Sequence, residues 1–149
     1  MIPIMSKISY TLLHEAELFI ATRHAHVYWI ENQKAIVCQA ITDYIPHQEF
    51  QYIFNEILEF ATENPTEMFI FDKSALVTFH QDSVRFFYFD WKPKMEKLGT
   101  KIYKHILPNN RTFKVSLDVT KDILRKEKPE ICIDVPCIEY IESIDEAFH

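Results

Sequence analysis

The single glycine of this chain, Gly99, is the feature that most constrains its fold. Average glycine usage of about 7% would give a chain of this length about ten. Phosphate-binding loops such as G-x-G-x-x-G and the P-loop, and the G-x-S-x-G nucleophile elbow, each need at least two glycines. The sequence therefore excludes nucleotide binding through a glycine-rich phosphate cradle.

The balance of charges limits the partners of the chain. It holds 16 Lys and Arg against 22 Asp and Glu, a formal net charge of -6 at pH 7. Its one basic run, residues 121–128, includes Asp122 and Glu127, so no cationic face is expected. We predict that the chain binds neither nucleic acid nor an anionic lipid surface, because both need clustered positive charge.

The N-terminal segment, the lengths of the apolar runs and the cysteines predict a cytoplasmic protein. Residues 1–7 lack the charged-then-apolar order of a signal peptide, and no stretch reaches the ~18 apolar residues of a membrane span. The cysteines Cys38, Cys132 and Cys137 all lie in apolar runs, where free cysteine behaves as a small hydrophobe. Cys132 and Cys137 would point to opposite faces of a regular strand, so we expect buried thiols in a reducing compartment.

No metal centre or other cofactor is expected. The spacing of Cys132 and Cys137 is not that of a zinc knuckle. His24 and His26 would share one face of a strand, as a metal pair does, but no third ligand is predictable nearby.

The order of apolar patterns predicts strands that alternate with helices. Residues 27–30 and 35–41 are β-prone and flank a polar turn, which is typical of an antiparallel hairpin. Later segments read as helices over 46–63 and 83–98 and a third helix that ends before Pro129, strands over 68–71, 102–107 and 131–141, and a terminal turn over 144–148. The third helix has Val115, Val119, Ile123 and Leu124 as its apolar stripe, and Gly99 stands where a left-handed cap ends the second.

These elements predict an α/β protein with a single mixed β-sheet, an N-terminal hairpin plus parallel strands, and helices packed on it. Residues 10–25 stay open between two assignments. A strand is possible at 10–13 and a short helix at 15–24, and periodicity does not decide between them.

Three segments in this order resemble the STAS-like fold, and most closely the uncharacterised SpoIIAA-like branch common in environmental bacteria. Residues 69–74 resemble the family strand that ends in Asp-x-Ser, and residues 91–99 resemble its W-x-P…L-G segment. Residues 141–148 resemble its closing strand and acidic helix. The resemblance covers residues 26–148, so we expect a STAS-like domain at 26–149 and an N-terminal extension, residues 1–25, packed on it.

The resemblance implies a regulatory site. Anti-sigma-factor antagonists with this fold carry Asp-Ser-Ser/Thr-Gly at a helix start, and phosphorylation of the first serine switches partner binding. Asp82 and Ser83 correspond by position, whereas Val84 and Arg85 replace the second hydroxyl residue and the glycine. A phosphate there would meet the positive end of a helix. The alternative is that Asp82 or Ser83 only caps the helix.

Asp72 and Ser74 are candidate ligand-binding residues. They follow a central strand, at the edge where open α/β sheets place their ligands. The alternative is local capping of the loop, in which Asp72 bonds its own backbone.

Residues 85–91 contain five aromatic side chains, more than one helical stripe can bury. If Val84, Phe87, Trp91, Met95 and Leu98 face the sheet, then Phe86, Tyr88 and Phe89 point elsewhere. Such surplus apolar surface indicates a partner interface, unless a terminal segment of the chain covers it.

Two functions follow from these patterns. The first is a non-enzymatic binding or regulatory module that acts through protein–protein interaction, as a homodimer or with a regulatory protein. The alternative is a carrier of a small apolar ligand, or a cryptic enzyme, with a pocket at the C-terminal ends of the parallel strands.

Overall fold

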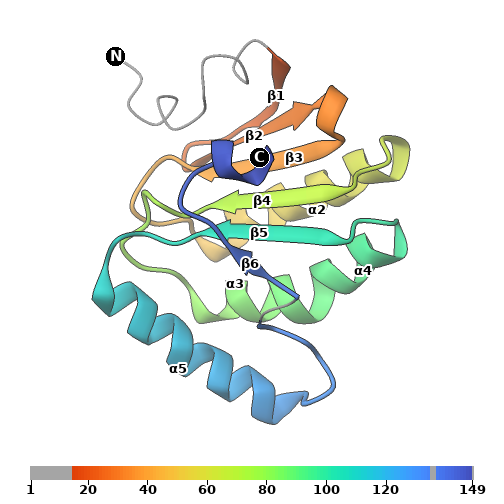
Figure 1. Cartoon of the computed structure of the whole chain (residues 1–149). Coiled ribbons are helices and arrows are strands. Elements are labelled where there is room, and N and C mark those ends of the chain that lie inside the picture. Colours follow the sequence, from red (N-terminus) through yellow and green to blue (C-terminus); the bar gives the residue numbers. More distant parts are fainter. Residues whose placement is uncertain (1–14, 135–136, 149) are drawn as a thin grey trace.

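A computed structural model describes residues 15–134 and 137–148, and these residues form one six-stranded sheet in the order β1-β2-β3-β4-β5-β6 (Figure 1). The strands are β1 (Ala16–Ala21), β2 (Ala25–Ile30), β3 (Ala35–Ala40), β4 (Met68–Asp72), β5 (Ile102–Ile106) and β6 (Glu139–Tyr140). The helices are η2 (Glu31–Gln33), α2 (His47–Glu63), α3 (Gln81–Arg85), η3 (Phe86–Trp91), α4 (Lys92–Lys97), α5 (Arg111–Glu127) and η4 (Asp145–Phe148).

The sheet is mixed, which confirms the predicted fold class. β1, β2 and β3 form an antiparallel meander, and β3 to β6 run parallel with helices in the connections. The predicted hairpin is β2–β3, in which Val27 lies opposite Cys38. Its turn closes through Lys34 in the left-handed conformation, with φ of 51°.

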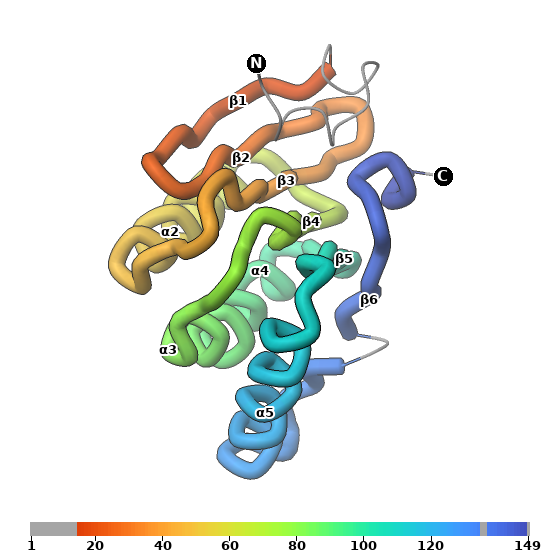
Figure 2. Tube along the Cα trace, turned by 90° about the vertical axis from the view of Figure 1, so that its left-hand side faces the viewer, coloured from red at the N-terminus to blue at the C-terminus, as the bar shows by residue number. Residues whose placement is uncertain are grey.

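Each face of the sheet has its own apolar core. Helices α2, α3, α4 and α5 lie on one side, and the C-terminal segment with η4 lies on the other (Figure 2). On β3, Ile36 and Cys38 belong to the core under the helices, whereas Ala35 and Val37 belong to the core under the C-terminal segment. A strand buried on both faces is typical of the parallel part of such a sheet.

The segment that sequence patterns left open between strand and helix is a strand. β1 pairs with β2, with a register shift between Leu18 and Ile20, so the sheet begins ahead of residue 26. The possible helix over 15–24 is therefore wrong, because residues 16–21 are held in the extended conformation by their pairing with β2. The possible strand at 10–13 lies outside the described residues.

The helix after β4 contains a wider π-helical turn, η3, between α3 and α4. Gly99 ends it with φ of 105°. The amide of Thr100 donates to the carbonyl of Met95, and the amide of Gly99 donates to the carbonyl of Glu96. This is a Schellman ending, which confirms the predicted role of the only glycine.

The predicted apolar stripe of α5 is mostly wrong. The buried side chains are Phe113, Leu117, Thr120, Lys121 and Leu124. Val115, Val119 and Ile123 lie on the outward face and are 51%, 55% and 37% exposed. The buried row includes a threonine and a lysine, so a search for apolar spacing selects the wrong face.

Within the described residues of 131–141, the predicted strand is present only at β6. The predicted thiols are wrong for two cysteines. Cys132 and Cys137 form a disulfide, while Cys38 is a buried free thiol. The amide of Cys137 donates to the carbonyl of Asp134 at 2.7 Å. The alternation of a regular strand therefore does not apply to the pair.

Candidate functional site

A cavity of about 30 Å³ lies at the carboxyl end of β4, beneath the start of α3. Its wall is mainly apolar, and its polar members are Lys73, Thr78, His80, Ser83 and Tyr88. The apolar members are Ile45, Phe50, Phe71, Leu76, Phe79, Val84, Phe87, Phe113 and Leu117. This is the edge at which a ligand pocket is expected in a parallel sheet.

Lys73 brings an amine to this cavity. It follows the last residue of β4, and its backbone amide donates to the carbonyl of Ile106 at 2.9 Å. The side chain is 8% exposed, and Nζ lies 5.0 Å from the centroid of the Phe71 ring. No carboxylate of the described residues forms an ion pair with it. Burial, and then the positive charge of Lys121, lower the pKa of Lys73 to about 7.

Ser83 is a buried member of the cavity wall rather than an exposed helix cap. It is 4% exposed, and its hydroxyl lies 2.9 Å from Nδ1 of His47. The ring of His47 stacks on that of His80, with 5.1 Å between centroids. The N-cap of α3 is His80, whose Nδ1 accepts a hydrogen bond from the amide of Asp82.

The prediction that Asp82 or Ser83 caps the helix is therefore wrong. Asp82 is exposed and pairs with Arg85 across one helical turn, with 3.1 Å between Oδ1 and Nη1. Histidine is not among the preferred N-cap residues, so the sequence carries little signal for this cap.

Asp72 and Ser74 lie beside the cavity but do not line it. Oδ1 of Asp72 accepts from the amide of Ser74 at 3.0 Å and from its hydroxyl at 2.6 Å. Oδ2 accepts from Nε2 of Gln39 at 3.0 Å. This is the local capping alternative, because the carboxylate bonds within its own loop and to the neighbouring strand. The side chain that lines the cavity at this edge is Lys73, between the two predicted residues.

The aromatic residues of η3 are covered largely by the chain itself. Tyr88 is 2% exposed and forms part of the cavity wall, so it is not a surface residue, contrary to the prediction. Phe86 is half-buried and lies edge-on to Phe50, with 6.3 Å between centroids. Phe89 is half-buried as well, with Nζ of Lys128 4.8 Å from its ring centroid.

Positive charge surrounds the inner side of this site. His105 is fully buried among aromatic rings, and neither ring nitrogen has a hydrogen-bond partner in the described part of the chain. Burial, and then Lys73, Lys121 and Lys92, hold the pKa of His105 well below its usual range. The buried amine of Lys121 bonds the hydroxyl of Tyr140. Lys121 also lies 3.8 Å from Oδ1 of Asp134, and Lys92 lies 3.1 Å from Oε2 of Glu96, so of these lysines Lys73 is the one without a carboxylate partner in the described residues.

Sequence reasoning missed Lys73 because a lysine that follows a strand is usually solvated. Its one signal was its place directly after a continuous apolar run. The two histidines considered as a metal pair do not meet a third ligand. Nδ1 of His24 lies 2.7 Å from Oε1 of Glu49, and the described residues contain no group of three metal-ligating side chains.

Comparison with known proteins identifies the fold. No family model matches the chain, and no curated protein matches its sequence. Its structure is similar to the unphosphorylated form of the anti-sigma factor antagonist SpoIIAA, with a TM-score of 0.56 and 12% sequence identity. The match covers 89% of this chain and 92% of that chain. The chain therefore has a STAS-like fold. Separately, none of its described helices is long and apolar enough to cross a membrane.

Proposed function

We propose that this STAS-like chain is a non-enzymatic regulatory module that acts through protein contacts, and that its first partner is a second copy of itself. The structural similarity to an anti-sigma factor antagonist supports the regulatory class, as an analogy of fold. The contact itself is assigned from the surface of the molecule.

The observation that carries this proposal is an apolar row on the outward face of α5, formed by Val115, Val119 and Ile123. α5 is a 17-residue helix whose opposite face is buried, and it borders the molecule below the sheet in Figure 1. Branched apolar side chains at i, i+4 and i+8 form a continuous ridge on a helix. An exposed ridge of this kind supports docking against another helix.

The α5 row is complementary to itself. Val115 and Ile123 stand four residues on either side of Val119, so an antiparallel pair of α5 helices would place Val119 against its copy and Val115 against Ile123. A two-fold contact uses the same patch on both subunits, as this arrangement does. The half-buried Phe86 and Phe89 are less suited to the contact, because they already pack against the core of their own chain.

The regulatory step is assigned to Ser83. Ser83 lines a cavity whose wall is mainly apolar and holds the buried amine of Lys73, so the second charge of a phosphoryl group would remain uncompensated there. Phosphorylation would therefore need the Ser83–His47 hydrogen bond to break and the start of α3 to move. Arg85, two residues later, is joined to Glu127 at the end of α5 by two hydrogen bonds, which would pass this movement to the contacting helix.

The proposal is tested by the solution mass of the wild type over a series of concentrations, together with Val119→Asp and Val77→Asp. Val77 is a matched control because it is also 55% exposed but lies in the loop before α3. The wild type and Val77→Asp are expected to reach twice the monomer mass of 17.8 kDa at high concentration. Val119→Asp is expected to stay monomeric with an unchanged fold. A wild type that is monomeric throughout, or equal effects of both substitutions, would overturn the proposal.

A further inference from the structure

We propose that the cavity beneath α3 binds a small monocarboxylate with a short apolar chain, and that the carboxylate pairs with the ammonium group of Lys73. This inference is independent of the proposed contact through α5, because the cavity lies on the sheet side of the helices.

The first argument is the isolation of the Lys73 amine. It is more than nine-tenths buried, lines the cavity, and meets an aromatic ring but no carboxylate in the described structure. Burying an amine without a counter-charge is costly, and an apolar side chain of similar length would avoid that cost. Functional sites often keep residues that lower the stability of the fold, because those residues are needed for binding. An anion in the cavity would provide the missing charge.

The second argument is the sign of the charge around the cavity. None of its lining residues is an aspartate or glutamate, whereas Thr78, Ser83 and Tyr88 contribute hydroxyl groups. Lys121 of α5 adds positive charge next to Lys73. The other ionisable groups near Lys73 are Asp72 of β4, whose carboxylate is hydrogen-bonded by Gln39 and Ser74, Cys38 of β3, His105 of β5, and His80 and Tyr88 of the cavity wall. Of these, His105 is held neutral by its burial, and Lys121 lies 3.8 Å from Oδ1 of Asp134, so the cation that the cavity wall presents to a ligand is Lys73.

The third argument is the size and lining of the cavity. Its volume of about 30 Å³ holds roughly two water molecules, so it suits a ligand of a few non-hydrogen atoms. Phenylalanine rings from α2, β4, η3, α5 and the loop before α3 are five of its fourteen lining residues. A short hydrocarbon chain fits such a wall, whereas the second charge of a phosphate or dicarboxylate would remain uncompensated. Acetate and propionate have the required size and charge.

The test is calorimetric titration of the full chain with formate, acetate, propionate and octanoate, with chloride and methylammonium as controls. Propionate or acetate is expected to bind at about pH 6, where Lys73 is protonated, and at least about tenfold more weakly at about pH 8.5. Lys73→Met is expected to lose this binding. Lys114→Met, which changes an exposed lysine of α5, is expected to retain it. Thermal unfolding of each variant distinguishes lost binding from lost structure.

Several results would overturn the assignment. Binding that survives in a folded Lys73→Met variant would place the ligand elsewhere. Chloride that binds as tightly as propionate would exclude a carboxylate site, and octanoate that binds most tightly would exclude a small one. The absence of heat and of any chemical-shift change at the cavity residues with every acid at about pH 6 would exclude the site altogether.

Discussion

The guanidinium group of Arg85 forms a two-point ion pair with the carboxylate of Glu127, with 2.7 Å from Nη2 to Oε1 and 3.2 Å from Nε to Oε2. The pair joins the helix start that carries Ser83 to the last turn of α5. Its hydrogen bonds lower the pKa of Glu127. In the proposed module this pair connects the buried hydroxyl with the helix that contacts a partner, so Arg85→Gln should uncouple a change at Ser83 from self-association.

The hydrogen bond between Ser83 and His47 should contribute about 1 kcal/mol of coupling to the unfolding free energy. Ser83→Ala and His47→Ala remove the two ends of one partly buried interaction. In a double-mutant cycle followed by urea unfolding, the double variant should therefore lose less than the sum of the two single losses. Strictly additive losses would show that the two side chains act separately.

Lys73→Met should raise stability near neutral pH. The pKa of Lys73 is about 7 in the folded chain against 10.5 for an ordinary lysine, so between these values only the unfolded chain holds the proton. The unfolding free energy of the wild type should therefore rise with pH over this window, by at most about 1.4 kcal/mol per pH unit.

The Lys73→Met variant should lack this rise, while Lys114→Met should keep it. Urea unfolding at several values of pH across the window measures both slopes. A wild-type slope that is unchanged by Lys73→Met would mean that Lys73 keeps an ordinary pKa in the folded chain.

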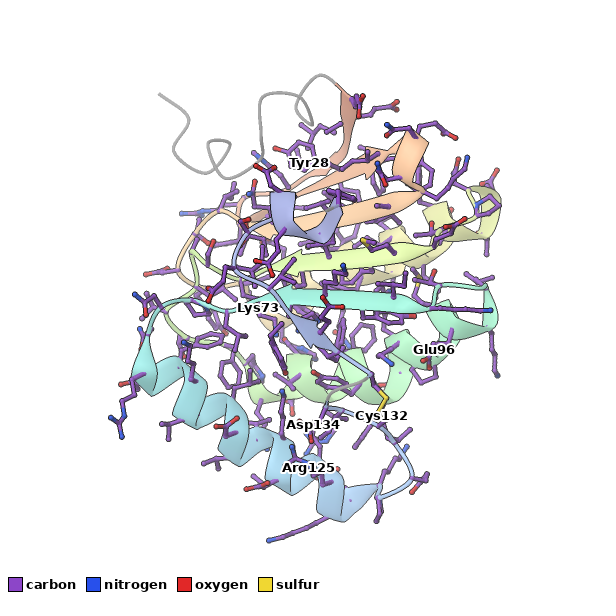
Figure 3. The ribbon with its side chains drawn as sticks, in the orientation of Figure 1. Tyr28, Lys73, Glu96, Arg125, Cys132 and Asp134 are labelled. Atoms are coloured by element: carbon purple, nitrogen blue, oxygen red, sulfur yellow. A yellow bond between two sulfur atoms is a disulfide. The ribbon has the colours of Figure 1, made fainter. Side chains whose placement is uncertain are left out.

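Removal of the disulfide by Cys132→Ser and Cys137→Ser should lower the unfolding free energy by about 2 kcal/mol, since the bond closes a short loop. The loop carries Asp134, whose Oδ2 accepts a hydrogen bond from Nε of Arg125 at 2.9 Å (Figure 3).

Thiol alkylation and mass spectrometry on protein from cells would also test the predicted reducing compartment. Two protected cysteines would contradict that location, because disulfides persist mainly in oxidising compartments.

Gly99→Ala should cost about 1 kcal/mol of unfolding free energy. A Cβ at Gly99 would meet no atom within 4 Å, so the cost comes from the backbone φ of 105° and not from a clash. Thermal unfolding of Gly99→Ala against Ser116→Ala, at an exposed site within α5, checks this. Equal melting temperatures would show that the helix end adjusts to the new residue.

The sequence was sufficient for much of the fold. The hairpin of β2 and β3, the helix α2 and the ending at Gly99 follow from local patterns, because each depends on residues adjacent along the chain. β1 did not follow, because its strand conformation depends on pairing with β2. The buried face of α5 was misplaced because it includes Lys121, which buries its aliphatic stem and bonds Tyr140 of β6. Tyr140 lies outside the helix, so the spacing of apolar residues within the helix does not reveal this contact.

The candidate site was predicted in location but not in residues. Its position at the C-terminal end of the parallel strands is a property of the fold. Its members are not: Asp72 is satisfied by Gln39 and Ser74, and Lys73 faces the cavity instead. Whether Asp72 or Lys73 faces the cavity depends on contacts with the neighbouring strand, such as the hydrogen bond from Gln39. A single sequence does not show which strands are neighbours.

The most direct test of the proposed function is disulfide trapping of Val119→Cys under mild oxidation, with Val77→Cys as the control. Val119→Cys introduces an accessible thiol into a chain whose own three cysteines are buried or paired. In an antiparallel α5 pair the two copies of residue 119 meet, so Val119→Cys should form a covalent dimer rapidly while Val77→Cys remains monomeric. Equal rates of dimer formation for the two variants, or no dimer for either, would contradict self-association through α5.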